Sequence, residues 1–465
     1  MRKLRCVSLG LAIALTSACA VGPHYHRPDV EPVSTYKELD DWKPSAPADA
    51  IARGAWWNIF ADNQLAQLES QVDVSNQNVQ AAVAAYDQAR AIVQQSQAGF
   101  WPSITASASR QRGNQVAGGT TPKITNSAGV AGSWEIDVWG QLRRTLENKK
   151  SSAQATAAAL AGARLSAQAL LATDYFQLRS QDQLQHLLDD TVAAQQLSLQ
   201  ITKSRYHYGV AAKADVVTAQ AQLLSSQSLQ INAKIQRAVL EHAIAVLVGR
   251  QPSNFSLAAA DMRNDVPTVP AGVPSTLLER RPDVAEAERK VAAANAEIGV
   301  AMTAFFPSLT LTGSDNFVGS SISHLITTPN SVCSFGPQLA LSVFDGGLRR
   351  AQVAEARAAY EISVDNYRQT VLSAFQQVED QISTLRILQD QASVEDEAVK
   401  AAKEAEKLTL DQYKAGTVPY SSVIAAQTTT FSSEKTALTV LLNRLDASIA
   451  LISALGGGWS TSDLP

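Results

Sequence analysis

The chain has few cysteines and little net charge. Its 465 residues include three cysteines, at positions 6, 19 and 333, and Cys6 falls within an N-terminal presequence. The sequence therefore lacks both a disulfide framework and the clustered thiolates of a zinc site, and Cys333 is expected to be a small loop residue. A net charge of −4, with 18% charged residues, provides no basic patch for binding nucleic acid.

Proline is absent from two long stretches, residues 123–251 and 338–418. Within them, Leu348–Ala415 also lacks glycine, and Gly162 is the single glycine between Gln141 and Tyr208. Both segments are rich in strong helix formers. At 1.5 Å per residue, each predicts a helix roughly 100 Å long.

Apolar residues in these segments recur at intervals of seven, which indicates a left-handed coiled-coil seam rather than one face of a globular core. They are Leu171, Leu178, Val192, Leu199, Val364, Val371, Val378 and Leu385. Gly209 and Gly416 are placed to end the long helices. Shorter helices are expected to return from about Ala214 to Val248 and from about Ser421 to Leu455, which predicts two helical hairpins.

The sequence is a tandem duplication. Phe100-Trp101-Pro102 returns as Phe305-Phe306-Pro307, Gly140–Arg144 returns as Gly346–Arg350, and Tyr206…Gly209 returns as Tyr413…Gly416. The order of these anchors is kept and their spacing barely drifts. Two similar units in one chain favour a symmetric assembly over a cleft enzyme.

Two short segments precede each long helix: Ser103–Ser109 with Gly129–Trp139, and Ser308–Thr312 with Pro337–Phe344. Their alternation of small polar and apolar residues suits a transmembrane β-hairpin. A soluble antiparallel hairpin would show the same alternation, so the pattern alone leaves both open.

Aromatic residues favour the membrane alternative. They fall at the beginning of the first strand and the end of the second, which share one level in an antiparallel hairpin, and so predict a belt at one membrane interface. The belt residues are Phe100, Trp101, Trp134, Trp139, Phe305, Phe306 and Phe344. Four strands cannot close a membrane barrel, so the chain is expected to oligomerise.

The N-terminus has the pattern of an export signal, with Arg2, Lys3 and Arg5 before a short apolar stretch. Leu15-Thr16-Ser17-Ala18-Cys19 resembles a bacterial lipobox, although Thr16 stands where leucine is usual. Ordinary cleavage at Ala18-Cys19-Ala20 is the alternative. Lipidation of Cys19 is favoured because this cysteine falls where the lipobox requires it.

Several ordered motifs resemble TolC-type outer-membrane channels, in the lipoprotein branch of OprM- and NodT-like efflux proteins. They run over essentially the whole mature chain. They include Val21-Gly22-Pro23, Trp56-Trp57, Ser133–Gly140, Tyr175–Arg179, Arg280–Val284 and Phe344–Gly347.

The resemblance implies a mainly α-helical fold with a small membrane β-barrel portion, built from two tandem repeats. Each repeat is a β-hairpin followed by a long coiled-coil helical hairpin. Three chains would form a 12-stranded β-barrel in the outer membrane of a Gram-negative bacterium and a 12-helix α-barrel in the periplasm. The expected partners are a periplasmic membrane-fusion adaptor, an inner-membrane RND pump and outer-membrane lipid. Neither cofactor nor catalysis is implied.

By the same resemblance, the hairpin tips form the periplasmic entrance and the adaptor-docking surface. The tip residues are Tyr206, Gly209, Lys213, Asp215, Val216, Tyr413, Gly416, Val418, Ser421, Ser422 and Val423. Ser422 and Ala425 replace two acidic gate residues, Val418 replaces a locking arginine, and Ser421 replaces a constricting leucine. These departures predict a weak cation preference, carried by Asp215 beside Lys213, and a closed state without the usual salt-bridge lock.

The expected division of the chain is a signal peptide at 1–18, a lipid-anchored tether at 19–60, repeats at 61–250 and 276–458, a linker at 251–275 and a tail at 459–465. His24 and His26 are assigned to a polar tether rather than a metal site. His186 and Asp190 are assigned to a solvated helix face. A type I secretion channel of the same fold, a periplasmic adaptor and a structural coiled-coil lipoprotein are the alternatives.

Overall fold

The structure is a computed structural model that describes residues 20–29, 36–37, 55–113, 123–263, 265–269, 280–461 and 464. The predicted signal peptide, Cys19 and most of the tether lie outside these residues. The chain divides into two compact units. The first comprises residues 1–30, 85–157 and 286–369, and the second comprises 31–84, 158–285 and 370–465.

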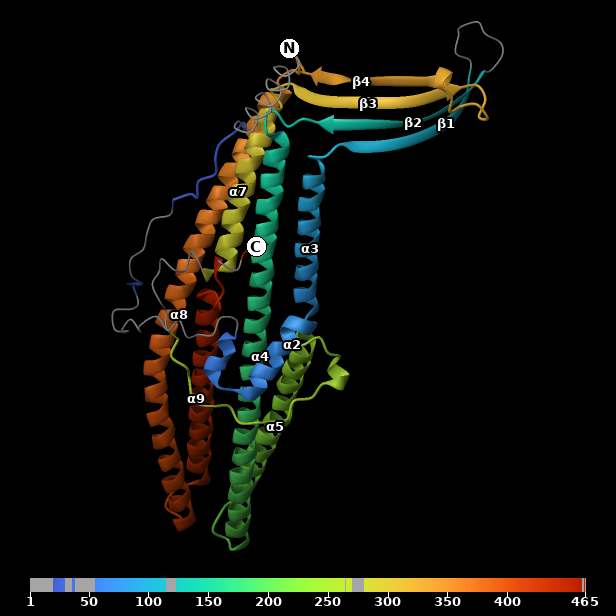
Figure 1. Ribbon diagram of the computed structural model, residues 1–465. Coiled ribbons are helices and arrows are strands. Elements are labelled where there is room, and N and C mark those ends of the chain that lie inside the picture. Colours follow the sequence, from blue (N-terminus) through green and yellow to red (C-terminus); the bar gives the residue numbers. More distant parts are fainter. Residues whose placement is uncertain are drawn as a thin grey trace. The chain divides into compact units, whose positions relative to one another are not determined.

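The first unit contains one four-stranded antiparallel sheet in the order β1-β2-β3-β4 (Figure 1). Its strands are β1 (Ser103–Gly113), β2 (Lys123–Glu135), β3 (Ser308–Gly319) and β4 (Ser331–Ala340). β1 and β4 are the edges, so each has one side without a partner strand in the described chain.

The two faces of the sheet differ in polarity. Directly opposite residues share a face, and the register places alternate residues of every strand on the same side. One face is mainly apolar and includes Ile104, Val130, Trp134, Leu311, Phe335 and Leu339. The other face is lined by serine and threonine, and two hydroxyl pairs cross it, Ser109–Ser127 at 2.8 Å and Ser314–Ser334 at 2.9 Å.

The predicted first residues of β1 and β3 are confirmed, whereas the other predicted strand ends were wrong. β1 and β3 continue to Gly113 and Gly319, because the alternation persists through polar residues that the prediction assigned to loops. β2 and β4 begin earlier than predicted and end at Glu135 and Ala340. Trp139 and Phe344 therefore follow the strands, and Cys333 is an exposed residue of β4 rather than of a loop.

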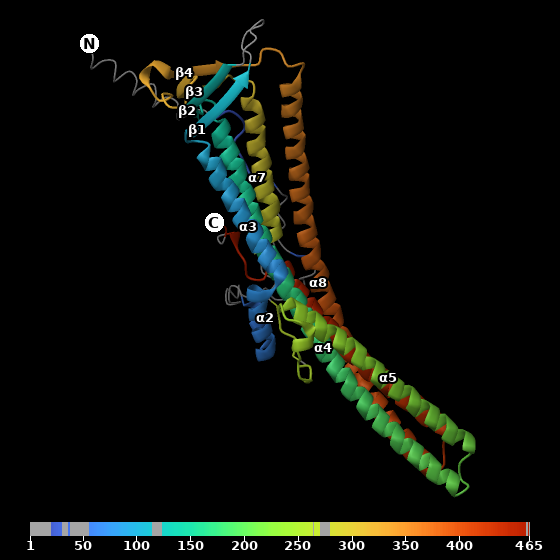
Figure 2. The same cartoon turned by 90° about the vertical axis from the view of Figure 1, so that its right-hand side faces the viewer.

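The helices agree closely with the sequence prediction. The long helices are α4 (Gln141–His207) and α8 (Leu348–Ala415), and the returning helices are α5 (Lys213–Leu247) and α9 (Tyr420–Ala454). Gly209 and Gly416 follow the long helices with φ of +75° and +84°, a conformation that costs glycine little. Figure 2 shows the α4–α5 hairpin closing at its tip.

All eight residues of the predicted heptad seams are buried. The shorter described helices are α2 (Asn63–Ser75), α3 (Gln77–Ala98) and α7 (Pro282–Thr303). Among the described helices, α9 alone is long and apolar enough to cross a membrane, but 44% of its apolar window is buried within the chain. Burial in a helical hairpin accounts for that apolar character.

Residues 20–29 pack along the helices of the first unit. Arg144 of α4 donates from Nε to Val21 O at 3.1 Å and from Nη2 to Gly22 O at 3.2 Å. Tyr25 donates its hydroxyl hydrogen to Glu288 of α7. Gly22 has φ of +107°, and a Cβ there would lie 2.5 Å from the Gly299 Cα, so only glycine fits this approach.

Candidate functional site at the hairpin tips

The two hairpin tips use the same turn. In the first, Val210 N donates to Arg205 O at 2.8 Å around Gly209. In the second, Thr417 N donates to Gln412 O at 3.1 Å around Gly416. The sequence prediction of two equivalent tips is therefore confirmed in backbone geometry.

An apolar cluster joins the two hairpins within the second unit. The buried members of this cluster are Val192, Leu199, Ala219, Leu223, Tyr413, Tyr420 and Val423. Val216 and Val418, both assigned to the tips from the sequence, are partly buried against it. Burial of a large apolar side chain is worth about 1.5–3 kcal/mol, so the cluster stabilises the packing of the two tips against each other.

Arg205 of α4 fastens the second tip through backbone atoms. Its Nη1 donates to Tyr413 O at 2.6 Å and to Lys414 O at 3.0 Å. These carbonyls belong to the last turn of α8, where the helix dipole favours a cation. The guanidinium carbon also lies 4.7 Å from the centre of the Tyr413 ring.

Tyr413 completes this contact. Its hydroxyl donates to Thr202 Oγ1 of α4 at 3.1 Å, and its ring lies 5.3 Å from that of Tyr420. Neither Arg205 nor Thr202 was predicted to belong to the site from the sequence. The sequence did contain a sign that the two tips differ: Arg205 precedes Tyr206 in the first tip, whereas the uncharged Gln412 precedes Tyr413 in the second.

The duplicated tip tyrosines have different surroundings. Tyr413 is 3% exposed, whereas its counterpart Tyr206 is 46% exposed. Tyr208 and Val210 are also exposed, at 78% and 64%. The first tip thus presents apolar side chains at the surface of the chain, and the second tip packs its tyrosine against its own neighbours.

The residues predicted to form the gate are dispersed around the tips. Asp215 accepts a hydrogen bond from Ala212 N at 3.4 Å, which places its carboxylate at the beginning of α5. Such a carboxylate satisfies a free N–H of the first helical turn. Lys213 and Ser421 are exposed, and Ser422 is partly exposed.

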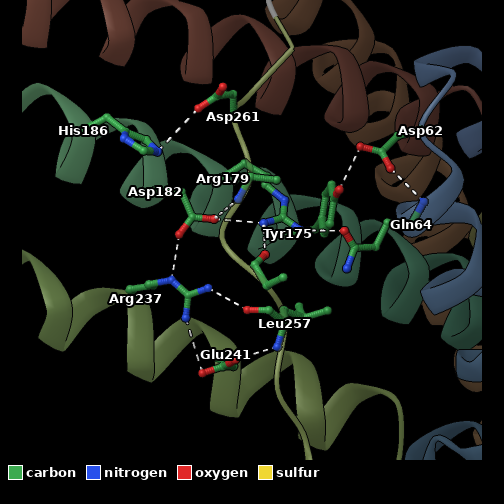
Figure 3. Close-up of polar contacts among 12 residues, drawn as sticks. Asp62, Gln64, Tyr175, Arg179, Asp182, His186, Arg237, Glu241, Leu257 and Asp261 are labelled. Carbon is green, nitrogen blue, oxygen red and sulfur yellow. Dashed lines mark hydrogen bonds and ion pairs between the residues drawn. The ribbon is translucent and has the colours of Figure 1, made fainter.

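A second polar cluster, the charged ladder, lies where α4 and α5 meet the segment that follows α5 (Figure 3). Asp182 accepts from Arg179 Nη1 at 2.8 Å and from Arg237 Nε at 2.6 Å. Arg237 Nη1 also lies 3.5 Å from Glu241 Oε2. Arg179 and Asp182 are almost completely buried, so each needs the other to compensate for lost hydration.

The charged ladder holds the backbone of residues 257–260. Arg237 Nη2 donates to Leu257 O at 2.7 Å, and Leu257 N donates to Glu241 Oε1 at 2.6 Å. Arg179 Nη1 donates to Ala258 O at 2.8 Å. Figure 3 also shows Tyr175 and Arg179 reaching Asp62 and Gln64 at the beginning of α2, at 2.7 and 2.8 Å.

Other assigned groups lie apart from the tips. His186 Nε2 lies 3.6 Å from Asp261 Oδ1, and both side chains are largely exposed, which agrees with a solvated face. His24 and His26 are exposed. Within the described part of the chain, no three histidine, cysteine or carboxylate side chains gather as a metal site.

Three carboxylates of the second unit, Glu69, Asp174 and Asp446, have raised pKa values, all mainly through burial. The pKa of Glu69 on α2 rises to about 9, with a smaller contribution from Asp73. The pKa of Asp446 on α9 rises to about 6, opposed by a hydrogen bond from Gln177 and reinforced by Asp174. Neither Glu69 oxygen has a hydrogen-bond partner among the described residues.

The aromatic residues assigned to a membrane belt gather where strands and helices meet. Trp139 stacks on Phe306 with ring centres 4.7 Å apart, and its Nε1 donates to Pro307 O at 2.8 Å. Trp134 Nε1 donates to Phe100 O at 2.9 Å. The remaining members, Trp101, Phe305 and Phe344, are exposed.

Each repeat contains a β-hairpin with one apolar and one polar face, followed by a helical hairpin, and the repeat occurs twice in the chain. This arrangement defines a TolC-type channel fold. The family described as "Outer membrane efflux protein" matches residues 68–250 and 273–457. The chain belongs to this family and is an efflux channel of the outer membrane.

Individual relatives agree over nearly the full length. The chain is 28% identical to the "Probable efflux pump outer membrane protein TtgC" of Pseudomonas putida, covering 97% of this chain and 95% of the relative. It is also 28% identical to the "Cation efflux system protein CusC" of Escherichia coli K12, covering 96% and 98%.

Solved structures share the fold. The outer-membrane channel OprN superposes with a TM-score of 0.86 at 28% identity, covering 95% of this chain and 100% of that one. The open state of the Neisseria gonorrhoeae MtrE outer-membrane channel superposes with a TM-score of 0.84 at 26% identity, covering 95% and 99%.

Proposed function

We propose that three copies of this chain form one passive conduit, a 12-stranded β-barrel continued by a 12-helix α-barrel. The observation that carries the proposal is the four-stranded sheet with two open edges and faces of opposite polarity. An open sheet cannot remain in lipid, because its edge N–H and C=O groups would have no partners. Pairing β1 of one copy with β4 of the next closes the barrel, with serine and threonine inside and apolar residues towards lipid.

In this proposal a periplasmic adaptor binds the hairpin tips, and an inner-membrane pump of the RND class supplies the energy. The channel itself catalyses no reaction. The exposed Tyr206, Tyr208 and Val210 support a docking role for the first tip, and the fastened second tip supports a role at the entrance.

We also propose the division of the chain that the sequence predicts. Residues 1–18 are the signal peptide, Cys19 carries the lipid, and residues 19–60 are the tether. The repeats span 61–250 and 276–458, separated by a linker at 251–275 and followed by a tail at 459–465. The described part of the tether, which contacts Arg144 and Glu288, supports a fixed position for the anchor.

The cargo belongs to the class of small molecules or ions. The relatives are named for different cargoes: a toluene pump of Pseudomonas putida and a cation system of Escherichia coli are both 28% identical to this chain. Sequence identity therefore does not select one cargo. Selection of cargo by the pump rather than by the channel is part of the proposal.

The test is the mass and symmetry of the detergent-extracted protein, with conductance in a planar lipid bilayer. We expect a three-fold particle with a helical tube roughly 100 Å long, and ionic currents through it. A monomer, or a trimer that conducts no ions under any applied voltage, would refute the conduit.

A further inference from the structure

Two arginines of β1, Arg110 and Arg112, lie on the apolar face of the sheet. The register pairs Arg110 with Asn126 and Arg112 with Ile124, on the same face as Ile104 and Val130. Every residue of β1 is exposed, including both arginines. A charged pair among apolar residues on a lipid-facing surface requires a physical reason, because burial of an unpaired charge in lipid is costly.

The position of the pair along the strand supplies part of that reason. β1 begins at Ser103, shortly after α3, and Gly113 is the residue at its other end. With a rise of about 3.3 Å per residue and a tilt of about 40°, Arg110 and Arg112 lie roughly 18 and 23 Å above Ser103. The apolar band of a membrane barrel is about 25 Å tall, so both Cα atoms lie in its distal third, from which the long arginine side chains can extend to the headgroup level of the distal leaflet.

No carboxylate of the residues that the structure describes neutralises the pair. Neither arginine has an ion-pair partner among the described residues, and the sequence of residues 114–122 contains neither aspartate nor glutamate. β4, which would flank β1 in the closed barrel, carries no charged residue. The nearest acidic residue on this face, Asp315, lies opposite Val130 and accepts from Ser331 Oγ at 2.8 Å.

The pair is specific to the first repeat. In the duplicated strand β3, the residues that follow from the Phe100 and Phe305 anchors are Asp315 in place of Arg110 and Phe317 in place of Arg112. The basic pair therefore does not follow from the strand architecture, which β3 forms without it. A trimer would carry three such pairs.

We propose that Arg110 and Arg112 bind the phosphate groups of the phosphorylated glycolipid in the outer leaflet. Residues two apart on one strand have Cα atoms about 6.6 Å apart, so both guanidiniums can reach one headgroup. Each guanidinium can bind phosphate oxygens through two parallel N–H donors. This inference rests on the proposed conduit, because helices in the periplasm place the far end of β1 in the outer leaflet.

The test compares lipid bound to the processed, detergent-extracted channel. The variant is Arg110→Gln with Arg112→Gln, and the charge-retaining control is Arg110→Lys with Arg112→Lys. A third protein adds Gln111→Arg to the double glutamine variant, which places one arginine on the polar face. Native mass spectrometry counts the glycolipid and phosphatidylglycerol molecules retained per trimer.

We expect the double glutamine variant to retain at least about tenfold less glycolipid than the unsubstituted channel, because two charge-assisted contacts are lost. The lysine control should retain most of it, and Gln111→Arg should restore none. Unchanged retention in the double glutamine variant would overturn the site. An equal loss of phosphatidylglycerol, or restoration by Gln111→Arg, would overturn the assignment to the glycolipid on this face.

Conductance and membrane fractionation separate this test from that of the proposed function. If the unsubstituted chain forms no pore, the conduit is refuted regardless of bound lipid. If all variants form equal pores in the outer-membrane fraction and glycolipid retention is independent of the arginines, the inference alone fails.

Discussion

Arg205 and Tyr413 join the two hairpins of one chain, through a hydrogen bond of 2.6 Å from the guanidinium to the backbone carbonyl. Because the acceptors are backbone carbonyls, no substitution of an acidic side chain can remove this contact. The sequence predicts a closed state that lacks the usual salt bridge at Val418. Such a state is compatible with a second tip that Arg205 holds in place.

Arg205→Ala should loosen the entrance. Hydrogen bonds from a charged donor contribute about 1.5–3 kcal/mol, and the alanine variant loses two of them together with the ring contact. We expect more frequent large-conductance openings in planar bilayers. Lys203→Ala, which removes an exposed cation two residues away, is the control, and equal conductance in both variants would contradict a role for Arg205.

Asp182→Ala should destabilise the charged ladder. It leaves two guanidiniums, those of Arg179 and Arg237, without their shared carboxylate. Removal of one partner from a buried ion pair costs about 3–5 kcal/mol, and we expect a loss of that size in the free energy of unfolding. Asp190→Ala on the exposed face of α4 should change the thermal midpoint little, and a similar drop in both variants would argue against the ladder.

Glu69 predicts a pH dependence of stability. Its pKa rises to about 9 through burial, so the folded chain keeps the proton that the unfolded chain releases above its ordinary pKa. The folded state therefore binds more protons between about pH 4.5 and 9, and this carboxyl lowers stability by about 1.4 kcal/mol per pH unit as pH rises.

Glu69→Gln should remove that slope. We expect its thermal midpoint to exceed that of the unsubstituted protein by an amount that grows from pH 5 to pH 8. Asp87→Asn, at an exposed position on α3, should give parallel curves. A constant difference across this pH range would show that Glu69 does not hold its proton in the folded chain.

Gly249→Ala should destabilise the end of α5. Gly249 has φ of +69°, and a Cβ there would lie 2.2 Å from Ser75 O. We expect a loss of more than about 1 kcal/mol by chemical denaturation, since both the conformation and the contact oppose a side chain.

Gly162→Ala within α4 is the matched substitution. Its Cβ would meet nothing closer than Pro282 at 4.0 Å, so it should stabilise the helix by about 0.5–1 kcal/mol. Equal effects of the two substitutions would contradict the geometry assigned to Gly249.

The helices could be predicted from the sequence because their signals are local. Gly209 and Gly416 end α4 and α8 within one residue of the predicted ends, and the heptad positions are buried as expected. The strands were less predictable, since Arg110–Gly113 continues the two-residue alternation with polar side chains that resemble a loop.

The contacts between distant segments could not be predicted. Arg205 meets Tyr413, and Asp182 meets Arg237, only after both hairpins have folded and packed. Burial is equally non-local: Tyr206 and Tyr413 occupy the same place in the same motif, yet one is exposed and the other is enclosed.

That difference between Tyr206 and Tyr413 has an evolutionary consequence. Internal packing constrains position 413, because a substitution there disturbs Thr202, Arg205 and Tyr420 at once. The exposed residues at positions 206, 208 and 210 make no comparable packing contacts within the described chain, so they can change as the surfaces they meet change. The duplication has thus produced one tip whose tyrosine is held by contacts within the chain and one whose exposed side chains can be replaced without breaking those contacts.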